Sequence, residues 1–165
     1  MPKPWVLIVM GSDTDAEVMS QAAAALDELR VPYEFTVASA HRSPERTKTV
    51  IAEAEKNGAV VFIAGAGMAA HLPGVVASLT TKPVIGVPLA GGALQGVDAL
   101  YAIVQMPPGI PVASVAIGGA RNAGILAAQI ISTADADLAA RLKENRAAMA
   151  EGVTQKSRKV DKSTR

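Results

Sequence analysis

Strand-like and helix-like segments alternate along this chain, and that alternation restricts the possible folds more than any other feature. The run from Trp5 to Met10 is apolar throughout, which is typical of a strand covered on both faces. Four more strands are expected at residues 33–39, 60–64, 84–87 and 112–117. Strands separated by helices at this spacing predict an α/β domain with a parallel sheet, right-handed crossovers and helices on both faces.

The segments between the strands carry helix signals. Residues 11–15 interrupt the apolar pattern, and Thr14 with Glu17 has the spacing of a capping box at a helix start. Ser43-Pro44-Glu45 predicts a second helix start, because it joins a capping residue, a proline at the first helical position and an acid in the first turn. Further helices are expected through Val75-Val76 and over residues 97–104, 122–132 and 134–151.

The loops that follow the strands hold the residues best suited to chemistry. In an open parallel sheet, ligands bind beyond the carboxyl ends of the strands, near the point where the strand order reverses. This rule selects the loops at residues 11–15, 39–43, 65–71, 88–96 and 118–122. Both histidines of the chain, His41 and His71, lie in this set, whereas the loops at the opposite end are short and ordinary. The asymmetry predicts an enzyme.

The first of these loops is suited to a phosphate group. It offers a glycine, the hydroxyl of Ser12 and a helix N-terminus, whose free N–H groups and dipole attract anions. Helix capping explains Ser12 equally well. Asp15 would repel a phosphate placed beside it, so in a nucleotide complex we expect its carboxylate to face sugar hydroxyls instead.

The second loop, Ser39-Ala40-His41-Arg42, places an imidazole beside a guanidinium. Imidazoles take up and release protons near neutral pH, and a guanidinium binds phosphate or carboxylate through its planar fork. Considered alone, either side chain is more often a solvated surface residue. Their shared position at the ligand end of the sheet favours a role in catalysis and binding.

The third loop, residues 65–71, is rich in small residues that let the backbone approach a ligand closely. Such a loop suits an oxyanion or a planar carboxylate held by main-chain N–H groups. The alternative is a tight turn before Pro73, with His71 bonded to the backbone at a helix start.

Several chemistries lack the residues that they need. The chain has no cysteine, and two histidines without a nearby acidic cluster make a poor metal site, so no metal is expected. A Walker-type phosphate loop, a complete dinucleotide turn and the aromatic faces of a flavin site are also missing, so no cofactor is expected. Acid/base chemistry on a small anionic ligand remains.

The length of 165 residues suits one domain. We expect residues 1–151 to form a single catalytic α/β domain with a C-terminal helix, and residues 152–165 to form a frayed, polar and basic tail. A net charge of +1 gives no case for nucleic acid as the partner, and no apolar stretch approaches the roughly 20 residues of a membrane helix. With no cysteine and no signal-peptide pattern, a cytoplasmic location is expected.

Five longer motifs resemble the class I N5-carboxyaminoimidazole ribonucleotide mutases. They occur in the family's order and are MGSDTD at 10–15, SAHRSP at 39–44, GAGMAAHLPG at 65–74, VQMPPGIPV at 104–112 and NAGILAAQI at 122–130. The resemblance implies a three-layer α/β/α, flavodoxin-like fold and a cytoplasmic enzyme of purine biosynthesis. It also implies a homo-octamer and a functional link to an ATP-dependent N5-carboxyaminoimidazole ribonucleotide synthetase.

The resemblance further implies a role for each loop. His41 would be the general acid/base, and the phosphoribosyl group would be held by Ser12, Asp15 and Arg42, with Ser39 close by. The pocket for the migrating carboxylate would be lined by the third loop and the residue after it, including Gly67, Met68, His71 and Leu72. Many family members have a glycine where Met68 stands, and the segment 118–121 is shorter here than in some members.

Two other functions remain open from the sequence. An aminoimidazole ribonucleotide carboxylase would use free CO2, but the related carboxylases usually carry lysine where Arg42 stands and lack the pattern of residues 65–73. A non-catalytic nucleotide-binding module on the same fold would not depend on His41.

Overall fold

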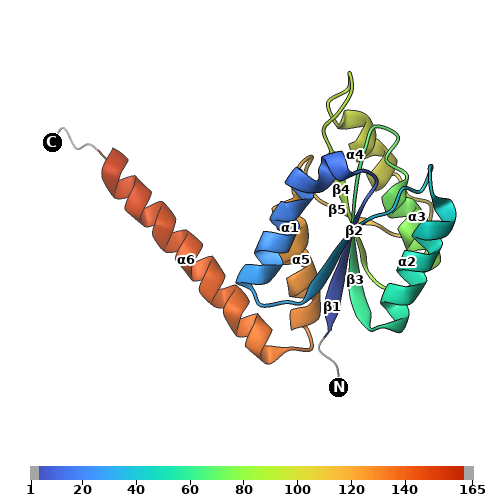
Figure 1. The fold of residues 1–165 in the computed structure, drawn as a ribbon. Coiled ribbons are helices and arrows are strands. Elements are labelled where there is room, and N and C mark those ends of the chain that lie inside the picture. Colours follow the sequence, from blue (N-terminus) through green and yellow to red (C-terminus); the bar gives the residue numbers. More distant parts are fainter. Residues whose placement is uncertain (1–3, 162–165) are drawn as a thin grey trace.

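A parallel five-stranded sheet forms the centre of the computed structural model, which describes residues 4–161 (Figure 1). The strands are β1 (Trp5–Met10), β2 (Tyr33–Val37), β3 (Ala59–Gly67), β4 (Val84–Leu89) and β5 (Ala113–Ser114). The helices are α1 (Ala16–Glu28), α2 (Pro44–Lys56), α3 (Leu72–Leu79), α4 (Val97–Val104), α5 (Ala120–Ser132) and α6 (Ala136–Val160). The three-layer α/β/α architecture expected from the alternating pattern and the resemblance is confirmed.

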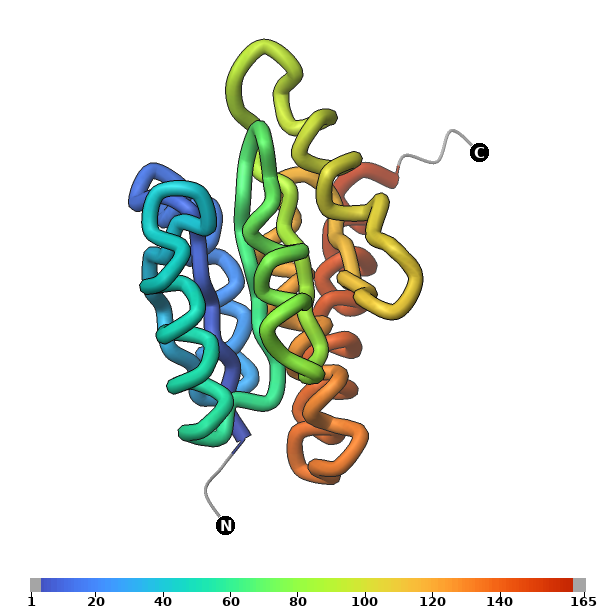
Figure 2. The backbone as a smooth tube through the Cα atoms, turned by 90° about the vertical axis from the view of Figure 1, so that its right-hand side faces the viewer, coloured from blue at the N-terminus to red at the C-terminus, as the bar shows by residue number. Residues whose placement is uncertain are grey.

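The strand order is β2-β1-β3-β4-β5, which is the flavodoxin-like order. The direction of winding reverses between β1 and β3, so the crevice for ligands lies at the carboxyl ends of these two strands. The loop between β4 and α4 stands above this end of the sheet (Figure 2). The topology thus brings together the loops that the sequence singled out.

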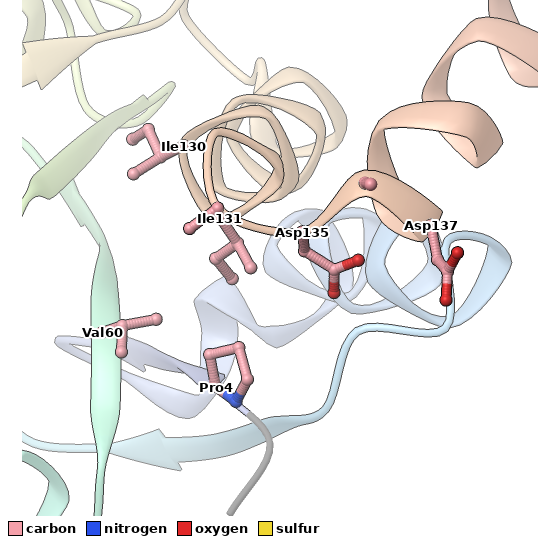
Figure 3. Close-up of a pocket in the computed structure, with 8 residues that line it drawn as sticks. Pro4, Val60, Ile130, Ile131, Asp135 and Asp137 are labelled. Atoms are coloured by element: carbon pink, nitrogen blue, oxygen red, sulfur yellow. The ribbon is translucent and has the colours of Figure 1, made fainter. Parts of the chain in front are cut away.

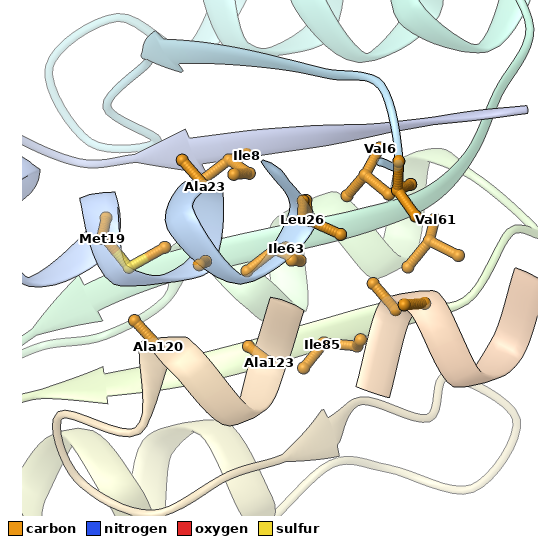
Figure 4. Close-up of a cluster of buried hydrophobic side chains, with 14 of the residues drawn as sticks. Val6, Ile8, Met19, Ala23, Leu26, Val61, Ile63, Ile85, Ala120 and Ala123 are labelled. Carbon is orange, nitrogen blue, oxygen red and sulfur yellow. The ribbon is translucent and has the colours of Figure 1, made fainter. Parts of the chain in front are cut away.

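The core has one half on each face of the sheet, and β1 divides its side chains between them. Val6, Ile8 and Met10 pack with α1 and α5, in the cluster that Figure 4 shows. Leu7 and Val9 pack toward α2, α3 and α4 on the other face. All five side chains are at most 1% exposed, which explains why this strand is apolar throughout.

Helix α5 packs very closely against α1. A Cβ atom added at Gly124 would lie 2.6 Å from the carbonyl oxygen of Ala22, so the two backbones approach as only a glycine allows. Ala120, Ala123 and Ala127 of α5 are fully buried within the chain. The small residues of this helix are therefore explained by packing inside one chain.

The strand expected at 112–117 is shorter than predicted. β5 pairs with β4 only through Ile85–Ala113 and Gly86–Ser114. Beyond this point the carbonyl of Pro88 accepts a bond from the N–H of Gly118, so the side of Pro88 that faces β5 has an acceptor but no N–H to donate. The missing donor ends the regular ladder.

The predicted tail is wrong as far as Val160. Helix α6 continues past residue 151 to Val160, because the glutamine, lysines and arginine of this segment are good helix formers and no proline interrupts it. Its start is capped by Asp135, whose carboxylate accepts a 2.9 Å bond from the N–H of Leu138. The helix projects from the body (Figure 1), and residues 162–165 of the predicted tail lie outside the described part of the chain.

Within residues 4–161, no helix combines the length and the apolar character needed to cross a bilayer.

Candidate active site

A cavity of about 630 Å³ opens at the carboxyl ends of the strands, at the crevice set by the topology. Its walls come from the loops after β1, β2, β3 and β4. Eight of the nine predicted site residues line it, namely Ser12, Asp15, Ser39, His41, Arg42, Gly67, Met68 and Leu72. The ninth, His71, does not line the cavity but lies directly behind His41. The structure thus gathers residues from four separate stretches of sequence.

The loop after β1 forms a short 3-10 turn, Asp13–Asp15, before α1 begins. The Ser12 hydroxyl accepts bonds from the N–H of Thr14 at 3.4 Å and from its hydroxyl at 3.0 Å, so Ser12 caps this turn while facing the cavity. The predicted capping box of Thr14 and Glu17 is wrong. The cap of α1 is Asp15, and its side chain makes no capping bond. The extra turn moves the helix start beyond the spacing on which the prediction rested.

Asp15 is a half-buried acid at the rim of the cavity. Burial raises the pKa of its carboxyl above the ordinary value, and repulsion from Asp13 adds to this effect. A backbone hydrogen bond from Ser12 and the positive charge of Arg42 act in the opposite direction but do not outweigh burial. Its ionised carboxylate is thus incompletely solvated and is suited to accept hydrogen bonds from ligand hydroxyls.

The loop after β2 is fixed by its own serines. The N–H of Ser39 donates to the Ser43 hydroxyl at 3.2 Å, and that hydroxyl donates back to the Ser39 carbonyl at 3.1 Å. The Ser39 hydroxyl accepts a 3.2 Å bond from the N–H of Arg42. These bonds hold the tight turn that presents His41 and Arg42 at the cavity. Ser43 therefore braces the loop, and it makes no side-chain capping bond to α2.

Arg42 connects two walls of the cavity. Its guanidinium donates a 3.2 Å hydrogen bond to the carbonyl of Gly11, in the loop after β1. The side chain is exposed and forms no ion pair with an acid of the chain within 4.0 Å in residues 4–161. Its remaining N–H donors therefore stay available for an anionic ligand beside Ser12.

His41 and His71 form a pair that the sequence did not predict. Nε2 of His41 lies 2.7 Å from Nδ1 of His71, and the rings meet edge to face with their centroids 4.8 Å apart. The two nitrogens are at hydrogen-bond distance, and the tautomers of the two rings decide which nitrogen donates. His71 precedes α3 and makes no capping bond with its side chain. It orients His41 from behind and is not itself a wall of the cavity.

The loop after β3 turns sharply, with Ala70 and His71 bonding back to the carbonyls of Met68 and Ala69 at 2.8 Å each. The predicted loop at 65–71 begins inside β3, which extends to Gly67, and its small residues serve packing as well as the ligand. A Cβ at Gly65 would lie 2.4 Å from the Met19 sulfur, so Gly65 is small because the core fills the space beside it. Residues 66–69 of the predicted loop line the cavity, whereas Gly65, Ala70 and His71 do not.

The loop after β4 supplies site residues that the sequence analysis did not name. Leu89, Ala90, Gly91 and Gly92 line the cavity opposite the loop after β1. The loop had been selected by its place after a strand, and its Gly91-Gly92 pair was the available signal for close approach to a ligand.

A second cavity, of about 520 Å³, lies at the opposite end of the sheet (Figure 3). Its walls are mainly apolar, with Val60, Ile130 and Ile131 among them. Of its two acids, Asp135 already caps α6 and Asp137 is exposed. It offers no acid/base pair and no cationic group for an anion, so the candidate active site is the cavity at His41.

Across residues 4–161, no three histidine, cysteine or acidic side chains come together in a way that would hold a metal ion.

The chain is similar to a known protein family and to several of its members. Residues 5–152 match the family described as AIR carboxylase. The chain is 51% identical over 158 residues to the N5-carboxyaminoimidazole ribonucleotide mutase of Thermotoga maritima, covering 96% of this chain and 92% of that protein. It is 52% identical over 159 residues to the phosphoribosylaminoimidazole carboxylase of Schizosaccharomyces pombe, and spans only 29% of that longer protein.

Among solved structures, the crystal structure of Treponema denticola PurE has the same fold. The TM-score is 0.89 at 28% sequence identity, and the match covers 97% of this chain and 100% of the other. The likeness extends over the whole sheet and its helices.

Proposed function

The chain belongs to the AIR carboxylase family, and we propose that it is an N5-carboxyaminoimidazole ribonucleotide mutase of purine biosynthesis. It would convert the N5-carboxylated nucleotide into 4-carboxy-5-aminoimidazole ribonucleotide. The observation that carries the proposal is the position of His41 at a cavity whose other wall has the features of a phosphate site. The identity to the mutase of Thermotoga maritima, over nearly its whole length, supports the same activity.

Binding of the phosphoribosyl group falls to the loops after β1 and β2. Arg42 and the Ser12 hydroxyl face the phosphate, together with the free N–H groups of the turn. The carboxylate of Asp15 accepts hydrogen bonds from the ribose hydroxyls, which compensate for its incomplete solvation. Ser39 keeps Arg42 in place through its bond to the backbone N–H of Arg42.

The reaction needs one proton, which His41 donates in the first step and recovers in the last. His41 donates a proton to the exocyclic nitrogen as the bond between that nitrogen and the carboxylate carbon breaks, so CO2 leaves and a neutral aminoimidazole remains. The enamine-like C4 attacks CO2 and forms the new carbon–carbon bond. His41 then removes the proton from C4, which restores the aromatic ring. The bond to His71 keeps the ring of His41 oriented for both transfers.

The reaction also requires that CO2 stays in the site between its release and its attack by C4. Held beside C4, CO2 reacts in an effectively intramolecular step instead of a dilute encounter. The pocket for it lies among Gly67, Met68 and Leu72, with Gly91 and Gly92 opposite.

The wider assembly belongs to the same proposal. A cytoplasmic homo-octamer that works with an ATP-dependent synthetase of the carbamate nucleotide fits the family. Exposed apolar side chains support contacts between subunits, with Phe35 and Val37 on the edge strand β2 and Met149 and Val153 on the projecting α6.

The assay that tests the proposal supplies each nucleotide without ATP or bicarbonate and follows the C4-carboxylated product. Turnover of the carbamate nucleotide under these conditions is the expected result. Product formation only from aminoimidazole ribonucleotide and added CO2 would instead support a carboxylase. Nucleotide binding without any product would support a non-catalytic binding module.

A further inference from the structure

Met68 has two features that folding alone does not explain. Its backbone is in the left-handed region, with φ of 50°, a conformation that favours glycine. Its side chain is 59% exposed although it is apolar, and it lines the cavity. A residue that is strained in its backbone and exposed in its side chain gives the fold little, which points to a role in the site.

The Met68 side chain reaches across to the loop after β4. A Cβ added at Gly92 would lie 3.3 Å from the sulfur of Met68, and one added at Gly91 would lie 4.0 Å from its Cγ. A side chain at Gly92 would therefore crowd the thioether, whereas one at Gly91 would only come into contact with the Met68 side chain. Met68 thus lies against the loop after β4, and the two loops together line this part of the cavity.

We propose that Met68, lying against Gly91 and Gly92, closes the β3–β4 end of the cavity and determines how well CO2 is retained between its release and its attack by C4. The inference rests on the proposed function and names the residue that governs its intermediate. CO2 carries no net charge and no hydrogen-bond donor, so polar groups hold it weakly and a wall of methylene and sulfur atoms confines it by shape.

The chemistry predicts what an open wall would do. Breaking the nitrogen–carbon bond leaves neutral aminoimidazole ribonucleotide and CO2 in the site. If CO2 escapes, the bound nucleotide either dissociates or combines with a CO2 molecule from solution, with the C4 proton passing to His41 as before. Escape therefore appears as exchange with dissolved CO2 and as release of the decarboxylated nucleotide.

The test is incorporation of labelled CO2 during turnover. Unlabelled carbamate nucleotide is converted in buffer with ¹³C-bicarbonate and carbonic anhydrase, and mass spectrometry gives the labelled fraction of the carboxylated product. A sample without enzyme gives the spontaneous exchange, which is subtracted. Met68→Ala removes the side chain but keeps a non-glycine residue, Met68→Gly also relieves the backbone, and Met68→Leu keeps the bulk.

We expect low incorporation in the unchanged protein and in Met68→Leu, and incorporation raised about fivefold or more in Met68→Ala and Met68→Gly. The matched control is Leu94→Ala, because Leu94 is equally exposed at 60% in the loop after β4 but does not line the cavity. It should behave as the unchanged protein.

Three results would overturn the inference. Met68→Ala with unchanged incorporation would show that the side chain retains nothing. Leakage in Met68→Gly alone would assign the effect to the backbone, and equal leakage in Leu94→Ala would assign it to general loosening of the loops. Absence of turnover in the unchanged protein would refute the proposed function itself, which is a separate outcome.

Discussion

Asp15 is a site residue whose ionised carboxylate lowers the stability of the fold. Its carboxyl is half-buried without a full set of partners, and burial raises its pKa above the ordinary value of 3.8. The folded state then binds the proton more tightly than the unfolded state, so the ionised form destabilises the fold. That destabilisation is absent below the ordinary pKa and fully present once the pH exceeds the raised one.

Asp15→Asn is therefore expected to raise the free energy of unfolding at about pH 7, with the gain disappearing as the pH falls toward about 4. Urea unfolding at both pH values measures the effect. Glu17→Gln is the control, since Glu17 is an exposed acid in the first turn of α1 that interacts favourably with the helix dipole, and its loss should lower stability slightly. Equal stability of Asp15→Asn and the unchanged protein at both pH values would contradict this account.

At the scale of the element, glycine has a packing role in α5 but not in α6. Gly124 lies where α5 crosses α1, and an added Cβ would meet the Ala22 carbonyl at 2.6 Å. Gly152 lies in α6, where an added Cβ would meet nothing within 4 Å. The same substitution should therefore have opposite signs at the two positions.

Gly124→Ala is expected to lower the free energy of unfolding by about 1–3 kcal/mol, because the backbones must move apart. Gly152→Ala is expected to raise helix stability by about 0.5–1 kcal/mol, because alanine loses less backbone entropy than glycine. Chemical unfolding measures the effect of Gly124→Ala. Thermal melting of the protein, followed by the helical signal in circular dichroism, measures the effect of Gly152→Ala. Loss of stability in both variants would disagree with the packing described.

Some features of the helices and strands follow from the sequence of the segment itself, and others depend on neighbouring segments. Strand and helix order follows from apolar periodicity, so the parallel fold and the loops at the ligand end were predicted. The end of β5 depends on Pro88, which lies in a neighbouring strand. The end of α6 depends on helix formers in a polar segment, and the composition of that segment suggested a frayed tail. The apolar periodicity within a segment could therefore predict neither the end of β5 nor the end of α6.

The site shows the same division. Ser12, Asp15 and Arg42 were predicted, because each lies in a loop that the strand pattern selects and in a motif that resembles the family. The contact of His41 with His71 was not predicted, because it joins residues from two loops 30 positions apart. The role of Gly91 and Gly92 also depends on Met68 standing opposite them in space.

At the scale of the whole molecule, several large apolar side chains remain exposed on the single chain. Arg141 fixes the first part of α6 through a 2.9 Å bond to the Leu29 carbonyl, but the helix beyond it exposes Met149, Val153 and Val160. A long helix with few contacts to its own domain would gain stability if a neighbouring subunit covered these side chains.

The chain is expected to form a homo-octamer in solution, with a mass about eight times its own 16.9 kDa. Light scattering after size-exclusion chromatography measures this mass. Met149→Glu combined with Val153→Glu should reduce the assembly, because it places two charges on the exposed part of α6. A monomer mass for the unchanged chain would contradict the proposed assembly.

The central claim is that His41 carries the proton in both halves of the reaction, and His41→Asn tests it most directly. Asparagine keeps a polar side chain at an exposed position but cannot act as acid and base at neutral pH. Turnover of the carbamate nucleotide should fall by about 10²–10⁴-fold or more, while calorimetry should show nucleotide binding within a few-fold of the unchanged protein. Near-normal turnover in this variant would contradict the claim.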